Sequence, residues 1–233
     1  SKDSKNNSSK SFRRLVFDEL CANFFTLSEN RKIIKKEKIR KNFLQKKSNS
    51  IKKKLPFKLT SSQEKVLNEI NDDLLSKKRM FRIVQGDVGS GKTIVSLLAI
   101  SNVIESGYQC ALMGPTEILA KQHYELAKKI YQNSNFKIDF LTSKTEYRYR
   151  KEILNNLESG VTNLLIGTHA LFQKKIKFKK VGLVIIDEQH KFGVKQRSEL
   201  AKKGGDNCDV LLMSATPIPR TCLLYTSPSP RDG

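Results

Sequence analysis

Eight residues have the types and spacing of a phosphate-binding loop, G-x-x-x-x-G-K-T. They are Gly86, Asp87, Val88, Gly89, Ser90, Gly91, Lys92 and Thr93. Glycines let successive backbone N–H groups turn inward onto phosphate oxygens, and the positive end of a following helix adds to the attraction. The lysine would reach the β- and γ-phosphates, and the threonine hydroxyl would hold Mg²⁺. A chance glycine turn is the alternative, but the apolar run 80–85 before the loop and the helical pattern 93–105 after it favour a nucleoside triphosphate site.

A pair of carboxylates follows another apolar run. Asp187 and Glu188 come directly after residues 182–186, which read GLVII. A carboxylate that leaves a buried strand beside a phosphate loop can hold the Mg²⁺ that Thr93 also contacts, and the next carboxylate can orient and deprotonate the attacking water. A solvated acidic turn is the alternative. We expect Asp187 to be a metal ligand and Glu188 the base, with Lys92 completing the catalytic set.

Three further loops also follow strand-like runs and carry small or hydroxyl residues. Ser214-Ala215-Thr216 follows the last run and could hydrogen-bond the acidic pair or simply cap the next turn. Residues 114–117 (GPTE) and 167–170 (GTHA) offer backbone N–H and hydroxyl groups at a helix start, which suits nucleic-acid phosphates. Ordinary turns and N-caps remain the alternative for both.

The order of the elements predicts an α/β fold. Strands are expected at 80–85, 108–113, 136–141, 161–166, 181–186 and 210–213, and helices at 60–74, 93–105, 117–132 and 146–157. Continuous apolar runs favour strands buried on both faces, and alternation with helices favours a mostly parallel sheet covered on both sides. Ligands bind such sheets at the carboxyl ends of the strands. Thr60 and Gln63 fit a capping box, which is a fully structural explanation for that glutamine.

The net charge of +21 is concentrated in the first 60 residues. A basic arm beside a nucleotide site could contact phosphate backbones, or it could only solvate a surface. We expect residues 1–10 to be disordered and an amphipathic helix to cover Phe12–Leu27. Residues 35–54, dominated by cations, are expected to form a helix end and a flexible linker.

Several classes of protein are disfavoured by composition. The chain has no run of eighteen apolar residues and no apolar signal-peptide core at its start, so we expect a cytoplasmic protein without a membrane segment. The cysteines and histidines do not have metal-ligand spacing, and we expect reduced thiols rather than disulfides or a zinc site. The residues concerned are Cys21, Cys110, Cys208, Cys222, His123, His169 and His190.

Taken together, the motifs resemble those of a superfamily 2 helicase, and most closely the RecG-type branch-migration helicases. The resemblance rests on LPFKLT with Gln63, the phosphate loop, GPTEILA with Gln122-His123, GTHAL, DEQHKFGV and SATPIPRT, in that order over residues 55–221. It implies a RecA-like motor lobe that uses ATP and Mg²⁺ and acts on branched DNA such as Holliday junctions and forks. The related motor of a transcription-repair coupling factor is one alternative, and a non-catalytic nucleotide-dependent binding module is another.

The resemblance also implies roles for individual residues. Gln63 would contact the adenine, and His190, Ser214 and Thr216 would couple the nucleotide site to the DNA site. The DNA backbone would contact Thr116, Gly167, Thr168 and His169.

The resemblance also implies a domain organisation. We expect residues 1–54 to be a basic extension, 55–221 the first motor lobe, and 222–233 a non-native or disordered tail. Family members add a wedge domain and a second RecA-like lobe that bears arginine fingers. We therefore expect this chain to be a monomeric, poorly active fragment.

Overall fold

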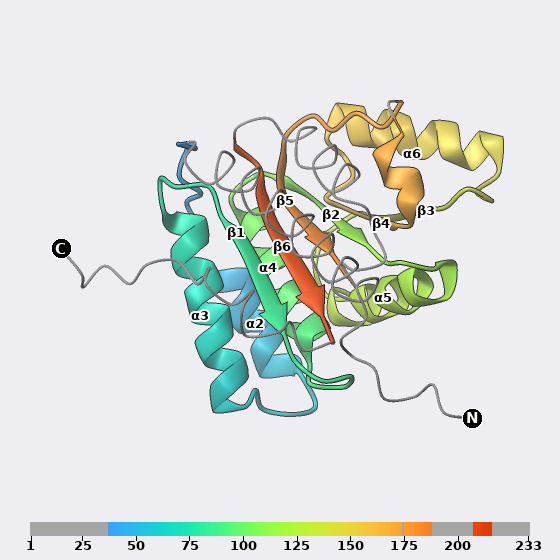
Figure 1. The fold of residues 1–233 in the computed structure, drawn as a ribbon. Coiled ribbons are helices and arrows are strands. Elements are labelled where there is room, and N and C mark those ends of the chain that lie inside the picture. Colours follow the sequence, from blue (N-terminus) through green and yellow to red (C-terminus); the bar gives the residue numbers. More distant parts are fainter. Residues whose placement is uncertain (1–36, 174, 188–206, 216–233) are drawn as a thin grey trace, which may run out of the picture. The chain divides into compact units, whose positions relative to one another are not determined.

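Six short strands form one parallel sheet in the computed structural model, which describes residues 37–173, 175–187 and 207–215. All of these residues belong to one structural unit, Lys36–Pro217. The strand order is β1-β6-β5-β2-β4-β3, so β6 lies between β1 and β5 although it comes last in the chain (Figure 1). The strands are β1 (Phe81–Gln85), β2 (Gln109–Met113), β3 (Ile138–Leu141), β4 (Leu164–Gly167), β5 (Val181–Ile186) and β6 (Asp209–Ser214). The predicted α/β class with a parallel sheet is confirmed.

The helices that begin at Ser61, Lys92, Glu117 and Tyr147 lie close to the positions predicted from the apolar periodicity, whereas the helix at Lys46–Lys54 and the 3₁₀ helix were not predicted. The helices are α2 (Lys46–Lys54), α3 (Ser61–Leu75), α4 (Lys92–Glu105), α5 (Glu117–Ile130), α6 (Tyr147–Ser159) and the 3₁₀ helix η1 (His169–Phe172). The Thr60–Gln63 capping box is present at the start of α3, where the Thr60 hydroxyl accepts from the Gln63 N–H. Within the described part of the chain, no helix is long and apolar enough to cross a membrane.

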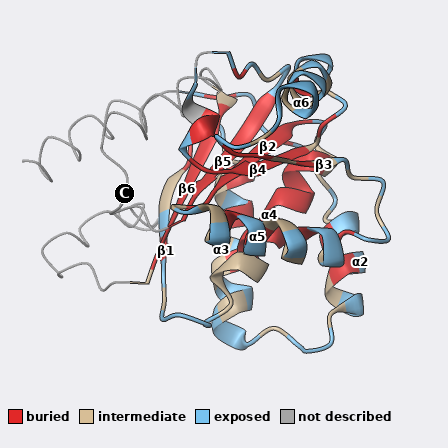
Figure 2. Ribbon diagram, turned by 90° about the vertical axis from the view of Figure 1, so that its right-hand side faces the viewer, coloured by how far each residue is buried: buried red, intermediate tan, exposed pale blue. Residues whose placement is uncertain are grey.

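Two apolar layers cover the two faces of the sheet. Along β5, Leu183 and Ile185 join the layer beneath α3, α4 and α5, whereas Val184 and Ile186 join the layer that includes Leu157 of α6. Figure 2 shows α6 on one side of the buried sheet and α3, α4 and α5 on the other. The alternation explains why β5 reads as a continuous apolar run, since both of its faces are covered.

The segment 37–54 is not a flexible linker, and the prediction made for it was wrong over these residues. α2 packs on α4, and the Glu105 carboxylate accepts from the backbone N–H groups of Leu44 and Lys47, both at 3.1 Å. Lys38 and Lys41 are buried, and both ammonium groups contact the Asp209 carboxylate at the start of β6. Periodicity could not reveal this packing, because the segment is held by long lysines whose partner is about 170 residues away in sequence.

Several predictions concern residues outside the described part of the chain. They are the Phe12–Leu27 helix, the tail 222–233, and the site residues Glu188, His190 and Thr216.

Candidate functional site

The predicted functional loops lie along one edge of the sheet. In a parallel sheet all carboxyl ends point the same way, so every loop that follows a strand lies at this edge. From the β1 side inward, the order is the phosphate loop after β1, Ser214 at the end of β6 and Asp187 after β5. The loops at 114–116 after β2 and 167–169 after β4 continue the row. The groups expected to bind nucleotide therefore occupy one half of the edge, and those expected to bind nucleic acid occupy the other.

The phosphate loop has the backbone conformation that its glycines permit. Gly89 and Gly91 have φ angles of 83° and 86°, in the left-handed region that favours glycine. The Ser90 N–H donates to the Asp87 carbonyl at 3.1 Å and closes a turn. A Cβ at Gly86 would lie 2.7 Å from the Ser90 hydroxyl oxygen, so a larger residue there would require the Ser90 side chain to move. The Gly86 N–H donates to the Ser214 carbonyl at 3.2 Å, which anchors the loop to β6.

Lys92 and Thr93 begin α4 directly after this turn. The Lys92 ammonium donates to the carbonyl oxygens of Gly86 and Asp87, the latter at 2.8 Å, so the side chain lies back over the loop. The first N–H groups of a helix lack partners within the helix and carry its positive dipole end. An ammonium and a helix start that face the same loop make a site for an anion such as a triphosphate.

Gln63 links the capping box to the phosphate loop. Its Oε1 accepts from the Thr60 backbone N–H at 3.0 Å, and its Nε2 donates to the Ser90 carbonyl at 2.9 Å. The structural explanation given by the capping box is therefore correct, and the side chain also contacts the loop predicted to bind nucleotide. The two interpretations of Gln63 are compatible.

Asp187 is a buried carboxylate held from two sides. Its backbone N–H donates to the Met113 carbonyl at 2.9 Å, which extends the pairing of β5 with β2. Its Oδ2 lies 2.8 Å from Nε2 of His123, which is on α5. Sequence reasoning assigned no role to His123. The available signal was its position between Ala120 and Ala127 on the buried face of α5, where a polar side chain needs a partner.

The donor groups near this edge suit Mg²⁺. A threonine hydroxyl and an aspartate carboxylate supply the hard oxygen ligands that Mg²⁺ prefers, usually as one or two carboxylates together with substrate phosphates. β1 and β5 are separated only by β6, so the end of β1, which leads into the phosphate loop, and the end of β5, which leads to Asp187, are about 10 Å apart at ordinary strand spacing. A triphosphate with its metal can span that gap.

The residues predicted to contact nucleic acid differ in exposure. Thr116 is exposed, and its hydroxyl caps α5 by accepting from the Leu119 N–H at 3.3 Å, so the N-cap alternative is present at this position. His169 is also exposed. Gly167 and Thr168 are buried. A Cβ at position 167 would collide with the Leu141 carbonyl oxygen, so strand packing alone is enough to explain the glycine. Of the four predicted contacts, the structure places the side chains of Thr116 and His169 at the surface.

Ionic and polar contacts tie together the loops after β2, β3 and β4. The Lys144 ammonium lies 2.9 Å from Oε2 of Glu117, and Arg150 donates to the Thr142 carbonyl at 3.4 Å and to the Gln173 side chain. The hydrogen bond from Lys144 lowers the pKa of Glu117 below its ordinary value, and Thr142, the Lys144 charge and His169 add to the effect. These contacts join the loop after β3 to the start of α5 and to the end of η1, the two elements that follow the candidate nucleic-acid loops.

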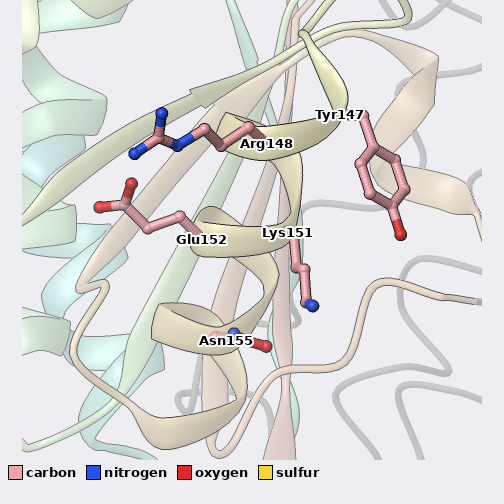
Figure 3. Close-up of a pocket in the computed structure, with 5 residues that line it drawn as sticks. All are labelled: Tyr147, Arg148, Lys151, Glu152 and Asn155. Carbon is pink, nitrogen blue, oxygen red and sulfur yellow. The ribbon is translucent and has the colours of Figure 1, made fainter.

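A shallow surface hollow on α6 lies away from the nucleotide loop. It is lined by Tyr147, Arg148, Lys151, Glu152 and Asn155, and in Figure 3 Arg148 and Glu152 extend to one side of the helix while Tyr147 and Lys151 extend to the other. α6 follows β3, the edge strand opposite to β1 in the sheet order. The hollow is therefore not the site of the triphosphate.

The described cysteines take no part in the chemistry. Cys110 and Cys208 are free thiols and fully buried. Burial raises the pKa of Cys208 to about 12 and that of Cys110 still further, so neither forms a thiolate at neutral pH. Among the described residues, no group of three or more histidine, cysteine, aspartate or glutamate side chains could hold a metal ion.

A parallel sheet with a phosphate loop after β1 and a buried aspartate after β5, one strand removed from β1, defines a P-loop nucleotide-binding lobe. The family model described as DEAD/DEAH box helicase matches residues 60–223. The chain belongs to this family.

The relatives refine the resemblance. The chain is 46% identical over 218 residues to the ATP-dependent DNA helicase RecG of Streptococcus pneumoniae, covering 91% of this chain and 31% of that protein. It is 46% identical over 211 residues to RecG of Bacillus subtilis, covering 90% and 31%. The predicted resemblance to RecG-type helicases is confirmed. The chain spans about a third of the length of these relatives.

Solved structures agree with this result. A structure of RecG bound to a three-way DNA junction matches with a TM-score of 0.76 and 40% identity, over 91% of this chain and 28% of that one. A structure of Mss116p bound to single-stranded RNA and AMP-PNP matches with a TM-score of 0.60 and 22% identity, over 76% and 39%. The second likeness shows the shared fold alone.

Proposed function

We propose that this chain is the first motor lobe of a RecG-type, ATP-dependent DNA helicase that acts on branched DNA. The observation that carries the proposal is the arrangement of the sheet edge. The phosphate loop, Ser214 and Asp187 follow three neighbouring strands, β1, β6 and β5, and the exposed Thr116 and His169 lie on the loops beyond them. The identity to RecG proteins supports the choice of DNA as substrate.

In this proposal the loop residues Gly86–Thr93 hold the triphosphate, and Gln63 contacts the adenine. Lys92 moves from the loop carbonyls to the β- and γ-phosphates. Thr93 and Asp187 hold Mg²⁺, which neutralises the charge that develops on the phosphates. Glu188 orients the attacking water and accepts its proton.

On the other half of the edge, Thr116 and the 167–169 turn contact the DNA backbone. Ser214, Thr216 and His190 transmit the nucleotide state to that half; Ser214 is well placed because its strand lies between β1 and β5. In the whole protein a second lobe supplies arginines that raise turnover by about 10³–10⁵-fold. We propose that the whole protein works as a monomer in the cytoplasm.

The test is junction-stimulated ATP hydrolysis by the full-length protein, with and without Glu188→Gln. The change keeps the size of the side chain and removes the base, so turnover should fall by about 10²–10⁴-fold while ATP binding is retained. A three-way junction should stimulate hydrolysis more than a linear duplex of the same length.

Equal turnover in the Glu188→Gln protein would remove Glu188 as the base. Equal stimulation by the two DNAs would contradict the branched substrate. A full-length protein that binds ATP without hydrolysing it under any DNA condition would instead be a nucleotide-dependent binding module.

A further inference from the structure

His123 is the polar member of the buried face of α5. The buried residues of this helix are Ala120, His123 and Ala127, at a spacing that places them on one side of a helix. His123 is only 7% exposed. An imidazole in such a place must find a hydrogen-bond partner, because leaving a buried polar group without one is destabilising.

That partner is the carboxylate of Asp187. The two side chains are 64 positions apart in sequence, Nε2 lies 2.8 Å from Oδ2, and Asp187 is 9% exposed. The carboxylate oxygen accepts and Nε2 donates, which requires the proton on Nε2. β2 holds the backbone of Asp187, as described above, and α5 holds its side chain. The orientation of the carboxylate is therefore fixed by two elements other than its own strand.

We propose that His123 is a positioning residue that orients Asp187 as a ligand for Mg²⁺. The inference rests on the proposed function, which makes Asp187 a metal ligand. A ligating carboxylate is normally held by an outer hydrogen bond, and loss of such a bond lowers metal affinity or activity by about 10–100-fold. His123 supplies this bond from a helix that begins at the candidate nucleic-acid contact Thr116. The same helix thus contacts both halves of the sheet edge.

A purely structural role for His123 is the competing explanation. A buried histidine that only completes the packing of α5 would affect folding, and it would affect all nucleotide binding alike. A positioning role would affect only the binding of ATP that depends on Mg²⁺. It changes the Mg²⁺ concentration that ATP binding requires, and it leaves the metal-free affinity for ATP unchanged.

The experiment titrates Mg²⁺ at fixed ATP and follows nucleotide binding to this chain by calorimetry, with a parallel ATP titration in EDTA. His123→Ala should raise the Mg²⁺ concentration at half-saturation by about 10–100-fold. His123→Gln should restore most of the loss, because the glutamine amide places a donor near the position of Nε2. Tyr124→Leu is the matched control: Tyr124 neighbours His123 on α5, and its ring packs at a tilt against Phe140 with ring centroids 5.2 Å apart.

A second arm uses Asp187→Asn. If His123 acts through Asp187, adding His123→Ala to Asp187→Asn should cause no further rise in the Mg²⁺ requirement. An unchanged Mg²⁺ requirement in His123→Ala would overturn the inference. So would an equal loss of affinity in Mg²⁺ and in EDTA, or a rise in Tyr124→Leu as large as that in His123→Ala. If the unmodified chain bound no ATP at all, the proposed function itself would fail.

Discussion

At the scale of single residues, Gln63 makes two contacts, one for each of its two roles: capping α3 and binding nucleotide. Oε1 completes the cap of α3, and Nε2 donates to the phosphate loop at Ser90. The cap needs only an acceptor, whereas the loop contact and the implied adenine contact need the amide. A substitution that keeps the acceptor and removes the amide therefore isolates the role in nucleotide binding.

Gln63→Glu should keep most of the stability of the fold and lose affinity for ATP. Glutamate is a normal third residue of a capping box, so the cap of α3 should be kept, and stability should fall only by the exposed hydrogen bond to Ser90. The lost amide and the new negative charge beside the Ser90 carbonyl should weaken ATP binding by about tenfold. Denaturant unfolding and calorimetric ATP titration measure the two quantities.

Gln63→Ala is the companion variant. It should lower the free energy of unfolding by about 1 kcal/mol, and it should weaken ATP binding as much as Gln63→Glu does. Full ATP affinity in the Glu variant would show that Gln63 is a capping residue only.

At the scale of elements, sequence patterns predicted the six strands and the helices α3 to α6, but not α2, because each of the predicted signals is local. The apolar run of β5 and the glycines before α4 are complete within a few residues. The order of the strands is different, since no local pattern places β6 between β1 and β5. For the same reason the order of the groups along the sheet edge, and the contact of His123 with Asp187, could not be read from the sequence, although the place of the loops at the carboxyl ends of the strands was predicted.

The loops after β2 and β3 are joined by the Lys144–Glu117 ion pair, and this gives a prediction about pH. The Lys144 hydrogen bond lowers the pKa of Glu117, so the pair stabilises the fold above the ordinary carboxyl pKa and is lost as the pH falls through the lowered value. Lys144→Ala should raise the pKa of Glu117 toward its ordinary value. Carboxyl-detected NMR titration measures the shift.

Lys151→Ala is the control for that titration, because Lys151 lies on α6 and is exposed. It should leave the pKa of Glu117 unchanged. A Glu117 pKa that is the same with and without Lys144 would show that the two loops are not coupled by this pair.

At the scale of the whole molecule, the segment 37–54 belongs to the lobe. Lys38 and Lys41 both contact Asp209, and all three side chains are fully buried. Asp209 also accepts from the Met80 N–H at 2.6 Å, so it joins the segment to the starts of β1 and β6. We therefore propose that the lobe begins near residue 36 rather than at residue 55. Its predicted end at residue 221 stays a prediction.

A chain that begins at residue 55 should be much less stable than one that begins at residue 36. Without the lysines the Asp209 carboxylate loses both of its cationic partners, and removing the partners of a buried charge costs about 3–5 kcal/mol. Asp209→Asn should therefore destabilise the longer chain and partly rescue the shorter one. Thermal unfolding of the four proteins measures the effect, and equal stability of the two wild-type lengths would restore residue 55 as the boundary.

The central claim is that Gly86–Thr93 binds the phosphates of ATP through Lys92. Calorimetric titration of Mg²⁺–ATP into this chain, with Lys92 intact and as Lys92→Ala, tests it most directly, with exposed Lys121→Ala as the control. Lys92→Ala removes a charge-assisted contact worth about 1.5–3 kcal/mol, so its affinity for ATP should fall by about 10–100-fold. The affinity of the Lys121→Ala control should not change. The same affinity in all three proteins would contradict the account.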